Sequence, residues 1–153
     1  MLVTLNADGS FYPETGKAGY AFWVSSNAGV FTSWGKLAEA GSSEEAEMMA
    51  VINGLHYVRN HKKLQSITKI IINSDCDLIR TIMEEPEKTL RKTAEKTKRR
   101  RWLTKHLIKY TNWYKGKHVA CEFRHVKAHK GTGTPRKYVN NWCDRHAKKG
   151  AKL

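Results

Sequence analysis

Four acidic residues are placed where their carboxylates can act together in metal chemistry. Asp8 and Asp75 follow two apolar runs, in "MLVTLNADGS" and "KIIINSDCD". Glu47 shares a stripe at helical spacing with apolar residues, and Asp144 is the one acid among nine lysines and arginines in residues 123–153. Clustered carboxylates repel one another unless divalent cations neutralise them, and oxygen-only ligands suit Mg²⁺ or Mn²⁺. The pattern favours a site with two ions roughly 3.5–4 Å apart, an arrangement that cleaves phosphodiester bonds.

Each acid also has an ordinary structural interpretation. Asp8 followed by Gly9 is typical of a turn, and Asp75 is a suitable N-cap for a following helix. Glu47 and Asp144 can each complement the dipole at the start of a helix. Only the joint placement of all four at one edge of one sheet favours metal binding over these separate explanations.

The elements that position the acids are predicted from periodicity and turn signals. Three strands with short connections come first, then a helix that begins with a capping box from Ser42 to Glu45. A short apolar run, typical of a buried parallel strand, two helical segments separated at Pro86, a last strand and a last helix follow. The strands are expected at 1–7, 18–26, 29–37, 69–74 and 118–126, and the helices within 41–63 and at 77–84, 99–115 and 140–151. This order predicts an α/β domain with a five-stranded mixed sheet, three antiparallel strands then two parallel ones, flanked by helices.

The acids fall at matching places on these elements. Asp8 is expected where the first strand ends and Asp75 where the fourth ends, and ligands bind outside the carboxyl ends of strands in open α/β sheets. The stripe containing Glu47 points that charge at the sheet, which is costly unless the charge is paired or bound to metal. Asp144 is expected in the first turn of the last helix, after Asn140.

The net charge is divided unevenly along the chain. Residues 1–87 hold 7 Lys and Arg against 11 Asp and Glu, or −4, whereas residues 88–153 hold 21 against 3, or +18. Such asymmetry indicates binding to nucleic acid phosphates. Four aromatic residues are interleaved with the charges at helical spacing, and most of them are expected to face the core. They are Trp102, Tyr110, Trp113 and Tyr114.

Other features bound the class of protein. The three cysteines are odd in number and lack CxxC spacing, which favours reduced thiols in a cytosolic protein. No apolar run is long enough to span a membrane, and the N-terminus lacks the pattern of a signal peptide. We expect residues 1–153 to form a single cytoplasmic domain, monomeric and without membrane contact.

The chain resembles type 1 ribonuclease H, including the ribonuclease H domains of reverse transcriptases. The resemblance rests on five segments in the family's order, "NADGS", "SSEEAEMMAVINGL", "NSDCDLI", "VKAHKG" and "NNWCDRHAKKGA". It implies a ribonuclease H-like fold and endonucleolytic cleavage of the RNA strand of RNA/DNA hybrids, leaving 5′-phosphate and 3′-hydroxyl ends. It also implies that the metal ligands are Asp8, Glu47, Asp75 and Asp144, and that the family's loop histidine is His129.

The resemblance suggests a role for each residue. Asp8, Asp75 and Asp144 would hold one Mg²⁺ ion beside the attacking water, and Asp8, Glu47 and the Gly9 carbonyl would hold a second beside the leaving oxygen. Mn²⁺ is expected to substitute for Mg²⁺. The loop histidine is suited to shuttle a proton or assist product release. The competing interpretation, a zinc site of His125 and His129, is less favoured because no Cys or His lies at ligand spacing beside them.

Hybrid recognition is expected to use two surfaces. Gly9, Ser10 and Ser43 would read RNA 2′-hydroxyls in the minor groove, with Asp77 and Asn140 nearby. The helix corresponding to the family's basic protrusion would bind DNA-strand phosphates without reading sequence. Its residues are Lys98, Arg99, Arg100, Arg101, Trp102 and Lys105.

Two departures from the family pattern bear on recognition. Ser43, Glu44 and Glu45 occur where many members have asparagine, and Asp77 occurs where an amide is common. Both add negative charge beside the expected RNA strand.

Three other classes were considered. A catalytically silent ribonuclease H-like module would keep the basic face but lose acids. A DNA-directed nuclease or transposase of the superfamily would not carry the "VKAHKG" loop. A basic structural protein would explain the charge but not Glu47.

Overall fold

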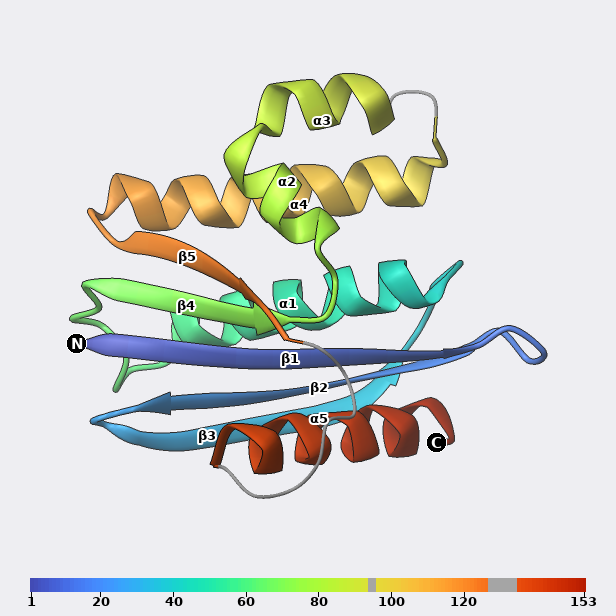
Figure 1. Ribbon diagram of the computed structural model, residues 1–153, viewed down its shortest axis with the longest axis horizontal. Helices are drawn as coiled ribbons and strands as arrows, with labels where there is room; N and C mark the ends of the chain where they lie inside the picture. The colour runs from blue at the N-terminus through green and yellow to red at the C-terminus, as the bar shows by residue number, and fades with distance from the viewer. Residues whose placement is uncertain (94–95, 127–134) are drawn as a thin grey trace.

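One mixed sheet organises the chain in a computed structural model that describes residues 1–93, 96–126 and 135–153 (Figure 1). The strand order is β3-β2-β1-β4-β5. The β1–β2 and β2–β3 pairs are antiparallel, and the β1–β4 and β4–β5 pairs are parallel. The strands are β1 Leu2–Tyr12, β2 Lys17–Ser26, β3 Gly29–Leu37, β4 Lys69–Ser74 and β5 Ala120–His125. The predicted five-stranded mixed sheet is confirmed.

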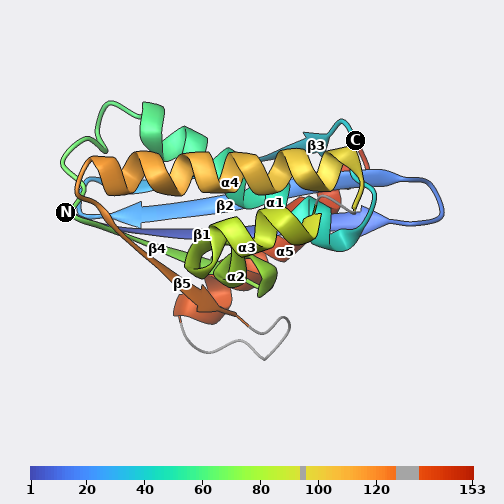
Figure 2. The same ribbon diagram turned by 90° about the horizontal axis from the view of Figure 1, so that it is seen from above.

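Helices cover both faces of the sheet. The helices are α1 Ser43–Asn60, α2 Leu78–Glu84, α3 Pro86–Thr93, α4 Lys98–Gly116 and α5 Pro135–Ala151. Helices α1 and α4 pack on one face and α5 packs on the other. The short helices α2 and α3 pack against α4 (Figure 2). They extend the molecule beyond the β5 edge (Figure 1).

The main core lies between the sheet and helices α1 and α4. Alternate β1 residues Val3, Leu5 and Ala7 point into it, as the twofold periodicity of a strand requires. The α1 stripe of Met48, Val51, Leu55 and Val58 meets them and is fully buried. Helix α1 begins as predicted, with the Ser42 hydroxyl accepting from the Glu45 amide at 3.2 Å.

Two predictions of where helices begin, at α3 and at α5, were wrong. Pro86 begins α3 rather than ending a helical region, and Pro135 begins α5 earlier than expected. Proline suits the first helical position because its fixed φ is already helical and its missing N–H is not needed there. Asp144 is therefore the tenth residue of α5 and not a first-turn residue.

The aromatic residues of α4 divide between core and surface. Tyr110 and Tyr114 are buried and Trp113 is partly buried, but Trp102 is 54% exposed. The expectation that most of these aromatic residues face the core is thus confirmed, and Trp102 is the exposed one of the four. Nowhere in the described ranges is a helix long and apolar enough to cross a membrane.

Candidate active site

A polar pocket lies where β1 and β4 leave their parallel pairing and meet α5. Its lining includes Asp8, Asp75 and Asp144, together with Asn140. The β1–β4 pairing ends at Asn6 opposite Asn73, so Asp8 and Asp75 both lie two residues beyond the last pair. The structure thus brings three of the four predicted acids to one pocket.

The expected end of the first strand at Asp8 was wrong. Strand β1 continues to Tyr12, and Asp8 pairs with Ala21 of β2. Gly9 is therefore not a turn residue. It permits close approach to α1, because a Cβ at Gly9 would lie 2.3 Å from the backbone carbonyl of Ala46.

That close approach places Glu47 beside β1 from the opposite face of the sheet. The Gly9 amide donates to Glu47 Oε1 at 3.0 Å, and the Ser74 hydroxyl lies 3.5 Å from Oε2. Glu47 is only 9% exposed, as its position on the apolar stripe predicted. All four acids therefore converge from β1, α1, the end of β4 and α5.

Burial governs the ionisation of the two inner acids. Loss of solvent raises the pKa of Asp8 and raises the pKa of Glu47 well above its ordinary value. A hydrogen bond between the two carboxyls lowers the pKa of Asp8 and raises the pKa of Glu47, while the charge on Asp75 raises both. A nearby cation would compensate the charge of both carboxylates and so favour their ionised forms.

The two outer acids face basic neighbours. His125 Nε2 lies 3.4 Å from Asp75 Oδ1, and Lys148 Nζ lies 3.1 Å from Asp144 Oδ2. Across the described ranges, no three Asp, Glu, His or Cys side chains are grouped tightly enough to hold one metal ion. The donor set still fits a hard divalent cation, because it consists of carboxylate oxygens around one polar pocket.

A buried pair of asparagines lies beneath the acids and was missed in the sequence. Asn73 Nδ2 donates to Asn6 Oδ1 at 2.9 Å, and both residues line the pocket. Asn73 Oδ1 is buried and has no hydrogen-bond partner among the residues that the structure describes. The sequence carried a signal for this pair, since Asn-x-Asp occurs at both Asn6–Asp8 and Asn73–Asp75.

The remaining residues predicted to act at the site lie at several positions around the pocket. His129 lies outside the described residues. Ser43 is exposed at the first position of α1, and Ser10 follows Gly9 on β1. Asp77 precedes α2 and pairs with Arg80 at 2.7 Å.

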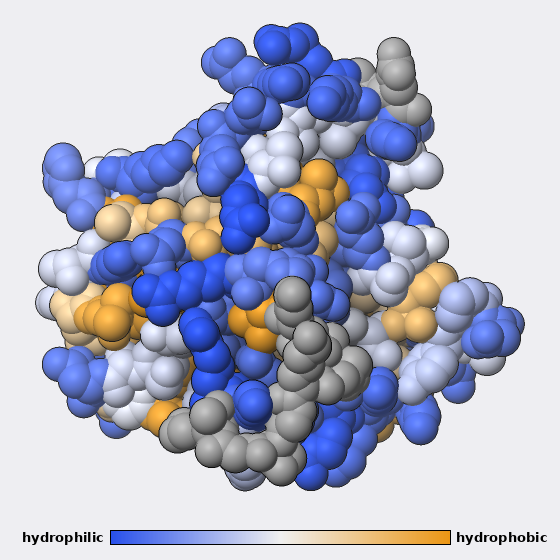
Figure 3. All heavy atoms as spheres, in the orientation of Figure 1, coloured by the Kyte–Doolittle hydropathy of each residue, from blue (hydrophilic) through white to orange (hydrophobic). Residues whose placement is uncertain are grey.

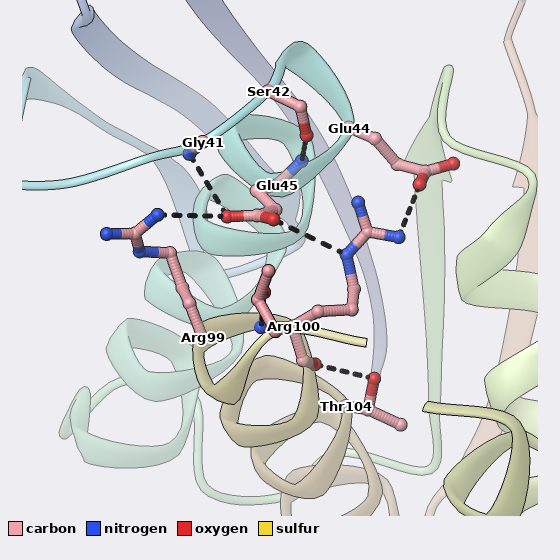
Figure 4. Close-up of polar contacts among 8 residues, drawn as sticks. Gly41, Ser42, Glu44, Glu45, Arg99, Arg100 and Thr104 are labelled. Atoms are coloured by element: carbon pink, nitrogen blue, oxygen red, sulfur yellow. Dashed lines mark hydrogen bonds and ion pairs between the residues drawn. The ribbon is translucent and has the colours of Figure 1, made fainter. Parts of the chain in front are cut away.

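Only some of the α4 residues that were predicted to bind phosphates are exposed. Its basic surface, which we define as Lys98, Arg101, Trp102 and Lys105, is exposed. Arg99 and Arg100 instead point at acids near the start of α1 (Figure 4).

Helix α3 was not predicted, and it carries the first basic residues of the charged second half of the chain. Lys88, Arg91 and Lys92 are exposed on this helix, where hydrophilic side chains cover the top of the molecule (Figure 3). The signal was present in the charge run after Pro86, which we had interpreted as a break between helices.

The sheet order and the flanking helices define the ribonuclease H-like fold, which solved structures of low sequence identity share. The N-terminal RNase H domain of Rv2228c from Mycobacterium tuberculosis has a TM-score of 0.70 at 19% identity, covering 99% of this chain and 94% of that chain. LC11-RNase H1 in complex with RNA/DNA hybrid has a TM-score of 0.68 at 16% identity, covering 98% and 96%. The RNase H domain of prototype foamy virus has a TM-score of 0.65 at 12% identity, covering 99% and 93%.

A match to a family profile identifies the protein family of this chain. The RNase H family profile matches residues 2–152, and the chain therefore belongs to the RNase H family of hydrolases. Members of this family generally use divalent metal ions. A search of curated proteins finds no match.

Proposed function

We propose that this chain is an endoribonuclease that cleaves the RNA strand of RNA/DNA hybrids with two Mg²⁺ ions. The products would carry 5′-phosphate and 3′-hydroxyl ends, and residues 1–153 would form one ribonuclease H domain. The observation that carries the proposal is the convergence of Asp8, Glu47, Asp75 and Asp144 from four elements in a chain of the RNase H family. The complex of LC11-RNase H1 with an RNA/DNA hybrid supports the choice of substrate.

The four carboxylates divide into two sets of ligands. Asp8, Asp75 and Asp144 would hold one ion, and Asp8, Glu47 and the Gly9 carbonyl would hold the other. Bound Mg²⁺ would lower the pKa of a water nucleophile and stabilise the leaving oxygen, and Mn²⁺ has the same ligand preference. The Gly9 amide fixes the Glu47 carboxylate at 3.0 Å, so this ligand is oriented before substrate arrives.

Basic groups would support the outer ligands and the proton transfers. Lys148 lies 3.1 Å from Asp144, and the hydrogen bond to this carboxylate raises the pKa of Lys148, so a charged ammonium group stays beside the outer ligand. His129 would shuttle a proton or help product leave.

Substrate would contact both sides of the pocket. Gly9, Ser10 and Ser43 would read the RNA strand, with Asn140 and Asp77 at the borders. The basic surface of α4 would bind phosphates of the DNA strand, because exposed cations bind phosphates without reading sequence.

Strand-labelled substrates test the proposal. Wild-type protein should cut the RNA strand of a hybrid with Mg²⁺ or Mn²⁺, leave duplex DNA and duplex RNA uncut, and stop in EDTA. Asp8→Asn should lower cleavage by more than about 100-fold, since losing even an outer-shell partner of a metal ligand costs 10–100-fold. Its circular dichroism and melting temperature should show that the fold is intact.

Three results would overturn the proposal. Full activity in folded Asp8→Asn would exclude the metal assignment. Cleavage of duplex DNA would indicate a DNA-directed nuclease, and hybrid binding without cleavage would indicate a silent binding module.

A further inference from the structure

We propose that Arg99 and Arg100 are positioning residues that hold the start of α1 against α4 and do not bind substrate phosphates. This inference rests on the proposed function, because α1 carries Ser43 and Glu47. It concerns an ion-pair cluster that joins the two helices, defined as Glu39, Glu44, Glu45, Arg99 and Arg100. Figure 4 shows the contacts of Arg99 and Arg100 with Glu44 and Glu45.

Glu45 lies at the centre of the ion-pair cluster. Arg99 Nη1 lies 3.6 Å from Glu45 Oε1, and Arg100 Nε lies 3.7 Å from Oε2. The Gly41 amide donates to the same Oε1 at 3.0 Å. One carboxylate therefore links both arginines to the backbone that leads into α1.

Each arginine has a second acidic partner. Arg100 Nη1 lies 2.7 Å from Glu44 Oε1, and Arg99 Nη2 lies 3.2 Å from Glu39 Oε2. A phosphate that bound the Arg100 guanidinium would have to displace the carboxylates of Glu44 and Glu45. The acids thus already bind the guanidinium nitrogens that a phosphate would contact.

Burial makes these pairs difficult to exchange. The side chains of Glu45 and Arg100 are only 7% and 17% exposed. A buried charge that loses its partner is left uncompensated, which is far more costly than the loss of a surface ion pair. Arg100 Nε is moreover buried, and within the described ranges it has no hydrogen bond, so it depends on the charge of Glu45.

The acids of the cluster also stabilise the N-terminus of α4, where the helix dipole is positive. Its first turn contains Lys98, Arg99 and Arg100 and no acid. Cations at a helix N-terminus are unfavourable, because the N-terminal end already carries partial positive charge. Glu44 and Glu45 offset this charge and are themselves favourably placed in the first turn of α1.

The cluster lies one helical turn from the proposed catalytic machinery. Ser43 adjoins Glu44, and Glu47 is two residues beyond Glu45. A shift of the α1 start would move the ligand that the Gly9 amide holds. The cluster also explains how this chain accommodates Glu44 and Glu45, because arginines of α4 pair with both.

Two substitutions test the assignment, because a positioning role and a phosphate-binding role predict different results for them. If the arginines position α1, Glu45→Gln and Arg100→Gln should each lower kcat for hybrid cleavage, by up to about 100-fold, the loss that a 1 Å misplacement can cause. The double variant should lose little more than either single one, because both remove the same interaction. If the arginines bind phosphate, Glu45→Gln should instead tighten hybrid binding by releasing them, and that result would overturn the proposal.

Arg101→Gln is the matched control. Arg101 is exposed on the next position of α4, so its loss should weaken hybrid binding and reduce the salt slope by about 0.7–0.9. A similar drop in salt slope for Arg100→Gln would show that Arg100 binds phosphate. If Arg100→Gln does not fold, Glu44→Gln should be used instead, because Glu44 is the more exposed partner of Arg100. This variant should also lower kcat.

Hydrogen exchange separates this inference from the proposed function. In Arg100→Gln, amide exchange in residues 41–46 should accelerate, whereas in Arg101→Gln it should not. Unchanged exchange in folded Arg100→Gln would overturn the positioning role even if the wild type cleaves hybrids. Conversely, a wild type that cuts no hybrid would refute the proposed function, and the exchange result would still decide the role of the arginines.

Discussion

The packing of α5 on the sheet at Gly19 gives a prediction with a calculable magnitude. A Cβ at Gly19 would lie 2.2 Å from both the Ala147 carbonyl oxygen and the Ala151 amide nitrogen. On the same helix, a Cβ at Gly150 would lie 2.1 Å from the carbonyl oxygen of Gly35. These are backbone atoms, so no side-chain rotation can relieve the overlap, and the whole helix must move.

The expected cost of Gly19→Ala follows from that overlap. Overpacking of this kind destabilises by about 1–3 kcal/mol. At about 2–4 °C per kcal/mol for a domain of this size, the melting temperature should fall by about 2–12 °C. Because α5 also carries Asp144, cleavage should fall and should need more Mg²⁺.

Thermal and urea unfolding of Gly19→Ala and Gly116→Ala would measure this effect. Gly116 ends α4, and a Cβ there meets nothing within 4 Å. Gly116→Ala should therefore stay within about 0.5 kcal/mol of the wild type. Equal stability of Gly19→Ala, Gly116→Ala and wild type would refute the close packing of α5.

Two further predictions concern substrate binding and the core. Affinity for a hybrid should fall steeply between about 50 and 200 mM salt, and replacing Lys98, Arg101 and Lys105 together by Gln should reduce the salt slope by about 2–3. A flat response of the wild type in an anisotropy titration would exclude this surface as the binding site. Tyr114→Phe should lower the free energy of unfolding by about 0.5–1.5 kcal/mol, because it removes the hydroxyl that donates to the buried Leu55 carbonyl at 2.7 Å. Urea unfolding measures this loss, and an unchanged midpoint would show that the bond contributes nothing.

Local periodicity predicted much of the fold and the inner part of the site. The buried run of β4 and the α1 stripe from Met48 to Val58 were both confirmed. The inward placement of Glu47 followed from the same stripe, and Ser42 caps α1 as the capping pattern predicted. These features depend on residues within one or two turns of each other, which is why sequence alone indicates them.

Features that depend on distant partners were missed or misread. The extent of β1 beyond Asp8 is set by pairing with β2, and the function of Gly9 is set by contact with α1. The Asn6–Asn73 pair spans two strands that are adjacent only in the folded sheet. Local propensity does not report such contacts, because they form between segments far apart in the chain.

The sequence by itself determined which chemical groups this protein has: four carboxylates, a basic second half and the periodicity that folds them into one α/β sheet. The tertiary structure decided which of those groups are free. Arg100 and Arg101 are neighbours with the same charge, yet Arg100 is held by Glu44 and Glu45 while Arg101 is exposed to solvent. The sign of a charge is fixed by the residue, but its availability to a substrate depends on which distant side chains fold beside it.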